Sequence, residues 1–411
     1  MAKRSVAPRL AVIATHPIQY CAPLFRLLAE RRNVVMHVFY GWEGGARGAA
    51  LDHGFGRAVQ WDVPLLGGYE YTFVPNESGD PGPHHFLGIR SSALVPTVRQ
   101  WAPDAVLVYG WSYLGHLSAL RAFHGKVPLI FRGDSTLLEE SGAVRPLLRR
   151  RVLSLVYRHI DCALYVGRRN QEYFRAHGVP ASRLVWAPHS VNNDHFKDAD
   201  GSHRRRAHEI RQSLGIPDGA PVAVFAGKLE SIKAPDLLLK SFHMRSTREA
   251  HLIFAGSGAL ERDLRRTASA DPNVHFIGFQ NQSLMPAVYR LGDIAVLPSR
   301  CETWGLAVNE AMASERAVIV SDHVGCAADL VVEGETGLTF PRGNAEALRK
   351  VLDAALQDVA RSQDMGAAAA RMINGWSLSE QASRIENAVL DLSRNRGYSE
   401  NALRSAGAAR V

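Results

Sequence analysis

Cysteine is scarce in this sequence, and long hydrophobic runs are missing from it. The four cysteines among 411 residues are scattered and form no C-x-x-C pair. This excludes a disulfide framework or a cysteine-based zinc site and is typical of a reducing compartment. No apolar run approaches the ~18 residues of a membrane-spanning helix, and Leu10–Ala14 is too short for the hydrophobic part of a signal peptide. We therefore expect a cytoplasmic protein.

Acidic residues are outnumbered by basic ones, which gives a formal net charge of +8. Such a charge favours anionic partners, namely diphosphates, lipid headgroups or nucleic acid. No nucleic-acid module and no interleaving of basic with aromatic residues is present, so we expect no nucleic-acid partner. Arg149, Arg150 and Arg151 lie in a helical pattern with Leu148, Val152, Leu155 and Val156 on one stripe. This helix either packs on a sheet with its arginines in water or makes a peripheral contact with an anionic membrane at its inner face.

Metal and nicotinamide motifs are also lacking. The only D-x-D pattern we single out, Asp198-Ala199-Asp200, lies in a hydrophilic stretch rather than at a strand end, so we interpret it as solvated charge. The pair His84-His85 has no third ligand at a metal spacing. The G-x-G at Gly256 lacks the third glycine of a dinucleotide fingerprint, which leaves a nicotinamide dehydrogenase a remote alternative. We predict no metal ligands and no cofactor.

Short apolar runs alternate with helical patterns through most of the chain. Near-continuous apolar strands separated by helices predict βαβ units and parallel sheets that are buried on both faces. The predicted strands are 10–15, 34–40, 105–109, 127–131, 162–166 and 184–187, and then 222–226, 251–255, 274–277, 294–297 and 317–321. The fold class is therefore α/β, with two Rossmann-like doubly wound domains that face a cleft.

A polar, charged stretch with glycine and proline separates the two series of strands. We predict an N-terminal domain over 1–195, a linker over 196–219 and a second domain over 220–376. A C-terminal helix is expected over 377–395, followed by a disordered tail over 396–411.

The second half carries the chemistry. Gly227 and Lys228 end its first strand, and Lys233 follows in the next loop. Glycine lets a ligand approach the backbone, and two lysines at the carboxyl end of a strand can hold a diphosphate in the crevice where open α/β sheets bind ligands.

A second group of residues follows a later strand, which ends near Pro298. Glu302 lies in a loop, Gly305 and Leu306 begin a helix, and Glu310 lies just over one turn into that helix. The free N–H groups of the helix start form an anion site. Carboxylates on either side of it suit hydroxyl groups, so we expect Glu310 to bind the ribose and Glu302 the donor sugar.

Residues 222–360 resemble the donor domain of the GT-B retaining glycosyltransferases, family 4, also called glycosyl transferases group 1. Glu302 and Glu310 match the E-x7-E pair of that family, and Gly227-Lys228 with Lys233 is similar to its phosphate clamp, with lysine in place of the commoner arginine. Phe276-Ile277-Gly278-Phe279 resembles the segment that meets the base. The resemblance implies the GT-B fold, with the C-terminal helix crossing back to the N-domain, and sugar transfer from a nucleoside diphosphate sugar with no metal.

The first half departs from the family pattern. Thr15-His16-Pro17-Ile18-Gln19-Tyr20 replaces the usual glycine-rich loop, and Arg132-Gly133-Asp134 stands where many members carry a histidine. His16, Arg132 and Asp134 follow strand ends that face the cleft, so they are the candidates for acceptor binding, with a purely structural turn as the alternative for each.

The expected function is a retaining glycosyltransferase in glycan, polysaccharide or glycolipid synthesis. The catalytic candidates are Glu302, Lys228 and Lys233, and the acceptor is expected to be a glycan or a lipid-linked acceptor. Two other functions remain open on the same architecture, a nucleotide-sugar 2-epimerase and a catalytically silent sugar-nucleotide-binding protein.

Overall fold

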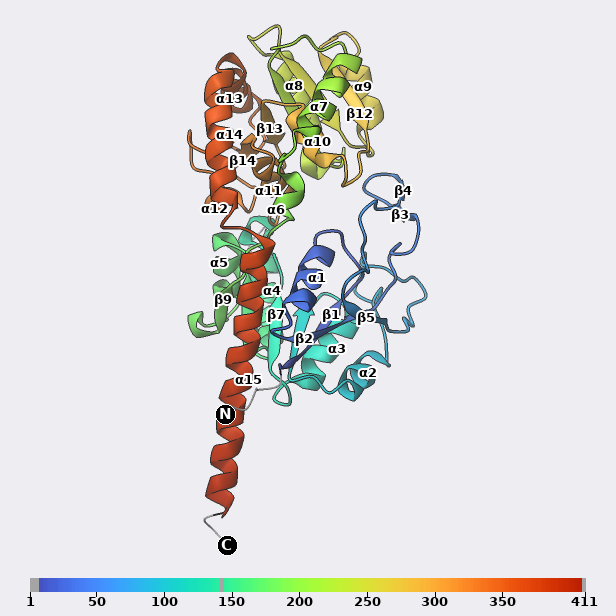
Figure 1. Ribbon diagram of the computed structural model, residues 1–411, viewed down its shortest axis with the longest axis vertical. Helices are drawn as coiled ribbons and strands as arrows, with labels where there is room; N and C mark the ends of the chain where they lie inside the picture. Colours follow the sequence, from blue (N-terminus) through green and yellow to red (C-terminus); the bar gives the residue numbers. More distant parts are fainter. Residues whose placement is uncertain (1–6, 141–143, 409–411) are drawn as a thin grey trace.

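The chain forms two parallel β-sheets, one in each half, with helices on both faces of each sheet (Figure 1). The computed structural model describes residues 7–140 and 144–408. Both sheets place the first strand of their half in the middle and add strands outward on either side. This confirms the α/β class with two Rossmann-like domains.

The N-terminal sheet has seven strands in the order β5-β2-β1-β6-β7-β8-β9. Residues of β1 alternate between two cores: Leu10 and Val12 pack on one face and Ala11 and Ile13 on the other, all fully buried. The strands are β1 (Arg9–Ala14), β2 (Val35–Tyr40), β5 (Glu70–Phe73), β6 (Ala105–Tyr109), β7 (Leu129–Arg132), β8 (Cys162–Tyr165) and β9 (Leu184–Trp186). The helices between them are α1 (Ala22–Arg31), α2 (Leu94–Gln100), α3 (Leu114–Phe123), α4 (Val144–Tyr157) and α5 (Arg168–Ala176).

The C-terminal sheet has six strands in the order β12-β11-β10-β13-β14-β15. Its strands are β10 (Val222–Ala226), β11 (His251–Ala255), β12 (Val274–Gly278), β13 (Ile294–Leu297), β14 (Ala317–Ser321) and β15 (Gly337–Phe340). Its helices are α8 (Pro235–His243), α9 (Glu261–Ala268), α10 (Met285–Arg290), α11 (Leu306–Ala313), α12 (Ala327–Leu330), α13 (Ala345–Gln357) and α14 (Val359–Ile373). The chain order reverses between β10 and β13, and ligands bind at this kind of switch point in doubly wound sheets.

The last helix, α15 (Leu378–Ala408), leaves the C-terminal domain and runs along the N-terminal one (Figure 1). Ala382, Ile385 and Val389 are fully buried in the same core as Leu10 and Val12. The predicted crossing of the C-terminal helix is thus confirmed. The helix also continues through most of segment 396–411, for which a disordered tail was expected, because its alanines, arginines and single leucine favour helix. Residues 409–411 lie outside the described part.

Helix also replaces irregular chain in the predicted linker. Residues 196–219 contain α7 (Ser202–Ser213), which follows the short α6 (Asn193–Phe196). Asp198 is not solvated charge: its side chain is 1 % exposed, accepts hydrogen bonds from the backbone N–H groups of His203 and Arg204, and lies 3.8 Å from Arg290. Its burial at the start of α7 compensates free N–H groups of the helix. The domain boundaries themselves stay predictions.

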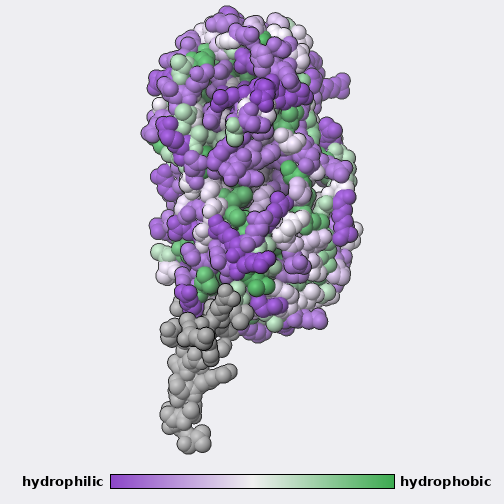
Figure 2. Space-filling view, viewed as in Figure 1, coloured by the Kyte–Doolittle hydropathy of each residue, from purple (hydrophilic) through white to green (hydrophobic). Residues whose placement is uncertain are grey.

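The face in Figure 2 is mostly hydrophilic, with hydrophobic residues in small separate patches. Within the described ranges, every helix is too short or too polar to cross a lipid bilayer.

Candidate active site

A cleft of about 940 Å³ lies between the two domains, at the carboxyl ends of both sheets. Among the predicted site residues, the C-terminal domain lines it with Gly227, Lys228, Lys233, Phe279, Glu302, Gly305, Leu306 and Glu310. The N-terminal domain contributes His16 and Asp134. The structure therefore brings together all but one of the residues that the sequence singles out.

Arg132 is the exception, and its assignment to the acceptor site is corrected. Its side chain is buried at the end of β7 and donates hydrogen bonds to the backbone oxygens of Ala187 (2.9 Å) and Pro188 (3.0 Å). A guanidinium so placed satisfies two buried carbonyl groups and fixes the turn after β9. Arg132 is a structural residue that does not line the cleft.

The two lysines approach the cleft from β10 and from the loop that follows it. Gly227 has φ +157°, and Gly256 on the neighbouring strand end packs so closely on it that a Cβ atom there would overlap the Gly227 carbonyl oxygen. Lys233, at the end of a short 3-10 turn (Ser231–Lys233), forms an ion pair with Glu302. Lys228 forms another, with Asp52 of the N-terminal domain at 2.8 Å.

Glu302 is fixed by the loop between β13 and α11. Its carboxylate accepts a hydrogen bond from the Ser299 hydroxyl (2.8 Å), and its backbone N–H donates to the His323 carbonyl oxygen (3.0 Å). Gly305 then adopts φ +100°, which favours glycine, and turns the chain into α11. The free N–H groups of that helix start therefore face the cleft beside Glu302 and Lys233.

Glu310 lies deeper than Glu302 and is 3 % exposed. Its carboxylate accepts hydrogen bonds from the Tyr289 hydroxyl (2.7 Å) and from the side-chain amide of Gln282 (3.0 Å). Desolvation by burial raises the pKa of Glu310 to about 7, and hydrogen bonds from Tyr289, Tyr20 and Gln282 oppose that rise. Tyr20 comes from the N-terminal domain, so this carboxylate lies where the two domains meet.

On the N-terminal side of the cleft, His16 and Asp134 have different surroundings. The His16 ring contacts Trp42 edge-on, and burial lowers the pKa of His16 to about 4, so the ring is neutral. Asp134 accepts a hydrogen bond from the Thr303 hydroxyl (2.9 Å), which joins the N-domain to the loop that carries Glu302. Neutral His16 can act as a hydrogen-bond acceptor or donor toward a sugar hydroxyl.

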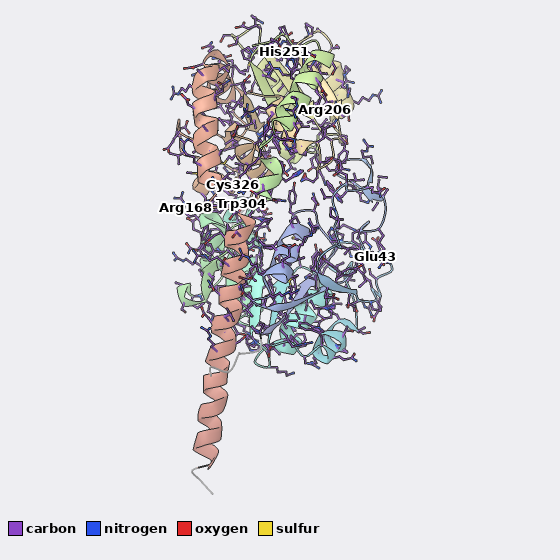
Figure 3. All side chains as sticks on the ribbon, viewed as in Figure 1. Glu43, Arg168, Arg206, His251, Trp304 and Cys326 are labelled. Carbon is purple, nitrogen blue, oxygen red and sulfur yellow. The ribbon has the colours of Figure 1, made fainter. Side chains whose placement is uncertain are left out.

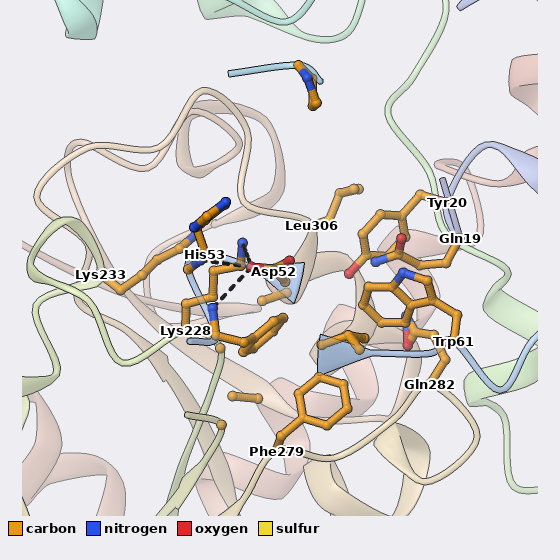
Figure 4. Close-up of a pocket in the computed structure, with 18 of the residues that line it drawn as sticks. Gln19, Tyr20, Asp52, His53, Trp61, Lys228, Lys233, Phe279, Gln282 and Leu306 are labelled. Atoms are coloured by element: carbon orange, nitrogen blue, oxygen red, sulfur yellow. Dashed lines mark hydrogen bonds and ion pairs between the residues drawn. The ribbon is translucent and has the colours of Figure 1, made fainter. Parts of the chain in front are cut away.

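Several cleft residues were missed by the sequence reasoning. Asp52, Phe55 and Trp61 lie in a glycine-rich stretch with no periodic pattern, while Tyr20, Gln282 and Tyr289 carry no motif of their own. Figure 4 shows Tyr20 and Trp61 beside Gln282, and Asp52 against Lys228. Tyr20 could have been found from its position, because it lies in the loop after β1. His16, in the same loop, was predicted to face the cleft.

The junction of the domains lies next to this site. Trp304 is buried there and donates its indole N–H to Asn309 (2.8 Å), whose amide donates to the His189 carbonyl oxygen (3.0 Å). Arg168 meets Asp329 at 3.3 Å across the same junction. Figure 3 shows Trp304 and Arg168 where the two domains meet.

The pair His84-His85 differs from its sequence interpretation. Within the described ranges, the Asp80 carboxylate lies 3.0 Å from His84 and 3.4 Å from His85. The two histidines therefore do have a third possible metal ligand beside them, which the sequence analysis did not expect. The group is exposed on a loop, and the Asp80–His84 hydrogen bond by itself accounts for the geometry.

Two family models match the chain. Residues 207–372 match glycosyl transferases group 1, and residues 70–189 match the glycosyl transferase 4-like domain. An alpha-D-kanosaminyltransferase from Streptomyces kanamyceticus is 29% identical over 195 residues, 45% of this chain and 49% of the relative. D-inositol 3-phosphate glycosyltransferase 2 from Catenulispora acidiphila is 32% identical over 231 residues, 52% of each chain. The chain thus spans about half the length of the curated relatives it matches.

Solved structures show the fold over nearly the whole chain. HepE from Anabaena, in complex with UDP and glucose, has a TM-score of 0.70 at 15% identity and covers 93% of this chain and 100% of its own. Sucrose-phosphate synthase from Thermosynechococcus elongatus has a TM-score of 0.68 at 17% identity, over 97% of this chain and 100% of its own.

The ionisation of Glu310 predicts a pH-dependent stability. Because burial raises its pKa above the ordinary value of 4.5 to about 7, folding is favoured by the neutral form, and that contribution is lost as the pH rises from 4.5 toward 7. Glu310→Gln stays neutral, so it should match the wild type at pH 4 and exceed it by about 1–3 kcal/mol in free energy of unfolding at pH 8.

Urea unfolding at the two pH values measures this difference. Glu209→Gln, an exposed residue on α7, is the matched control and should change neither value. If Glu310→Gln does not raise the free energy of unfolding at pH 8, burial does not favour the neutral form of Glu310.

Proposed function

Because the chain belongs to the glycosyl transferases group 1 family with the GT-B fold, we propose that it transfers a sugar from a nucleoside diphosphate sugar to an acceptor hydroxyl, with retention of anomeric configuration. One observation carries the proposal: Lys228, Lys233 and Glu302 converge with the start of α11 at the switch point of the C-terminal sheet. Lysines and free N–H groups suit a diphosphate, and the carboxylate suits sugar hydroxyls.

The charge of the leaving group explains why these residues would accelerate transfer. As the bond between the anomeric carbon and the diphosphate breaks, negative charge grows on the phosphate oxygens, and Lys228, Lys233 and the α11 N–H groups stabilise it. The acceptor oxygen bonds to the same face of that carbon, and the acceptor proton moves to the departing diphosphate. No covalent intermediate with the protein is assigned.

The donor class is supported by similar proteins. HepE was solved with UDP and glucose, and the curated relatives act as glycosyltransferases by name. Glycan, polysaccharide or glycolipid synthesis remains the proposed setting. The 2-epimerase and the silent binding protein gain no support, because both matching families are described as glycosyl transferases.

The two glutamates are expected to fail in different ways. Glu310→Ala should weaken both the free nucleoside diphosphate and the full donor, since its carboxylate is assigned to the ribose. Glu302→Ala should spare the nucleoside diphosphate but weaken the sugar-bearing donor, because it is assigned to the sugar. Loss of a charged hydrogen bond typically costs ~1.5–3 kcal/mol, or about ten- to a hundredfold in affinity.

Calorimetry with both ligands on both variants decides the roles, with the exposed Glu249→Ala as control. Equal weakening of the bare nucleoside diphosphate by both alanines would reverse the assignment. Normal binding and transfer in both variants would remove the proposed donor site.

We also propose that transfer needs no divalent metal ion, because two lysines and a helix start already face the expected diphosphate. Activity should survive EDTA, measured as product formation before and after the chelator. Activity that EDTA abolishes and magnesium or manganese restores would contradict this proposal.

We infer a peripheral contact with anionic membrane through α4. On the sheet side Leu153, Val156 and Tyr157 are buried, whereas Leu148, Val152 and Leu155 are 65, 46 and 55 % exposed. These three apolar residues form a stripe on the outer face, beside the exposed Arg150, Arg151 and Arg158. Of the stripe expected from the sequence, only Val156 packs inward. Basic residues flanking apolar ones suit the headgroup region of an anionic bilayer, where a lipid-linked acceptor would lie.

Replacement of Leu148 and Leu155 by serine should reduce partition onto mixed phosphatidylcholine–phosphatidylglycerol vesicles by about tenfold, because two leucines no longer leave water. Co-sedimentation measures the partition. The matched control is Met244→Ser with Val332→Ser, which removes two apolar residues of similar exposure from the C-domain. Equal partition of all three proteins would exclude α4 as the docking surface.

A further inference from the structure

A glycine-rich arm, residues 43–62, reaches from the N-terminal domain to the C-terminal one. It leaves the end of β2 and carries a short antiparallel hairpin, β3 (Ala50–Asp52) and β4 (Arg57–Val59). The arm is separate from the seven-stranded sheet. In Figure 1 the hairpin lies beside the C-terminal domain, away from the strands that precede it.

Polar contacts seat the arm on the ends of the C-terminal strands. The Asn281 side chain donates to the Gln60 carbonyl oxygen (2.6 Å) and accepts from the Asp62 N–H (3.3 Å). At the tip of the hairpin, the Ser257 hydroxyl donates to the Phe55 carbonyl oxygen (3.0 Å). These contacts engage backbone groups of the arm, so they hold its main chain in register on the other domain.

Aromatic contacts add to this docking. The Phe279 ring meets Phe55 edge-on with centroids 4.8 Å apart, and Trp61 with centroids 6.3 Å apart. The Arg57 guanidinium lies 5.2 Å from the same ring. The arm therefore covers Phe279, at the end of the segment Phe276–Phe279 that resembles the base-binding segment of the family.

At the centre of the arm, Asp52 holds Lys228. The carboxylate lies 2.8 Å from the ammonium group, and it accepts hydrogen bonds from the N–H groups of Gly54 (2.9 Å) and Phe55 (3.0 Å). Desolvation by burial raises the pKa of Asp52, but Lys228 and the N–H groups of Phe55 and Gly54 together outweigh it and hold that pKa below its ordinary value, so the carboxylate is charged. A Cβ atom on Gly54 would clash with the Lys228 side chain, which shows how closely the arm packs on it.

We propose that Asp52 occupies on Lys228 the position of the donor diphosphate, so that the donor must displace this carboxylate to bind and Asp52 thereby sets donor affinity. The inference rests on the proposed function, in which Lys228 binds the diphosphate. A diphosphate and a carboxylate that both contact one ammonium group repel each other, because both are negatively charged. The single positive charge of Lys228 therefore binds the diphosphate more strongly when the Asp52 carboxylate has moved away.

The negative charge of Asp52 can be removed by substitution while the turn that Asp52 forms is kept. In Asp52→Asn the amide oxygen still accepts from Gly54 and Phe55, since asparagine forms the same local turn as aspartate. The same oxygen, Oδ1, lies 2.8 Å from the Lys228 ammonium group. The asparagine can therefore keep a neutral hydrogen bond to Lys228, and what is lost is the negative charge. A partly exposed ion pair stabilises only weakly, and the repulsion between Asp52 and the diphosphate is relieved as well, so the affinity for a nucleoside diphosphate should rise by about three- to tenfold.

Isothermal titration calorimetry of the full chain with UDP, GDP, ADP and CDP at one ionic strength tests this. Asp263→Asn is the matched control, because it removes an equal charge from an ion pair with Arg266 on the exposed α9. It should leave the affinity unchanged. In a Lys228→Ala background, Asp52→Asn should no longer tighten binding, which separates the specific pair from a general charge effect.

Tighter binding by Asp52→Asn, absent from the control and from the Lys228→Ala background, supports the inference. Wild-type binding that Lys228→Ala weakens, but that Asp52→Asn leaves equal or weaker, overturns it and leaves the proposed function intact, with Asp52 then orienting the lysine. If no nucleoside diphosphate binds either wild type or Asp52→Asn, the proposed donor site fails and the inference falls with it.

Discussion

The geometry of a parallel sheet that is wound outward in both directions from its first strand governs this molecule. Where β10 and β13 lie side by side, their following loops leave toward opposite faces, and a crevice opens between them. Lys228 follows one strand and Glu302 the other, so two groups 74 residues apart face each other without any long connection. The strands beneath them are buried on both faces, and such supports hold charged groups in place better than free loops do.

Charge compensation is the second theme of the cleft. Lys228 and Lys233 are each paired with a carboxylate, one from the other domain and one from the same domain. These ion pairs allow Lys228 and Lys233 to lie near each other without a bound ligand, because each carboxylate reduces the repulsion between the two ammonium groups. Glu310, by contrast, has no cation beside it among its hydrogen-bond donors, which are uncharged hydroxyl and amide groups. Burial raises its pKa to about 7, so its neutral form is populated near that pH.

Periodicity and glycine positions were sufficient to predict the two sheets except for their edge strands β5 and β15, and to predict the residues that line the C-terminal half of the cleft. Runs such as Val222–Ala226 are apolar throughout, and only a strand buried on both faces explains that pattern. The helix α7 was missed because charged residues dominate it and only Ala207 is buried. Arg132 was wrongly assigned to the cleft because its position at a strand end places its Cα atom near the cleft but does not determine the direction of its long side chain. The arm could not be predicted, since its contacts join residues about 200 positions apart and leave no local pattern.

The position of α15 has a consequence for how the chain acquires its structure during synthesis. The core that contains Leu10 and Val12 also contains Ile385 and Val389, so β1 cannot complete its packing during synthesis until α15, which follows both sheets in the chain, has been made. Until then α1 covers this face of the N-terminal sheet without α15, and the apolar residues that α15 buries stay exposed on the nascent chain. Domains usually fold in the order of their synthesis, but here the helices that cover the second sheet, α8 to α14, all precede the helix that completes the first core.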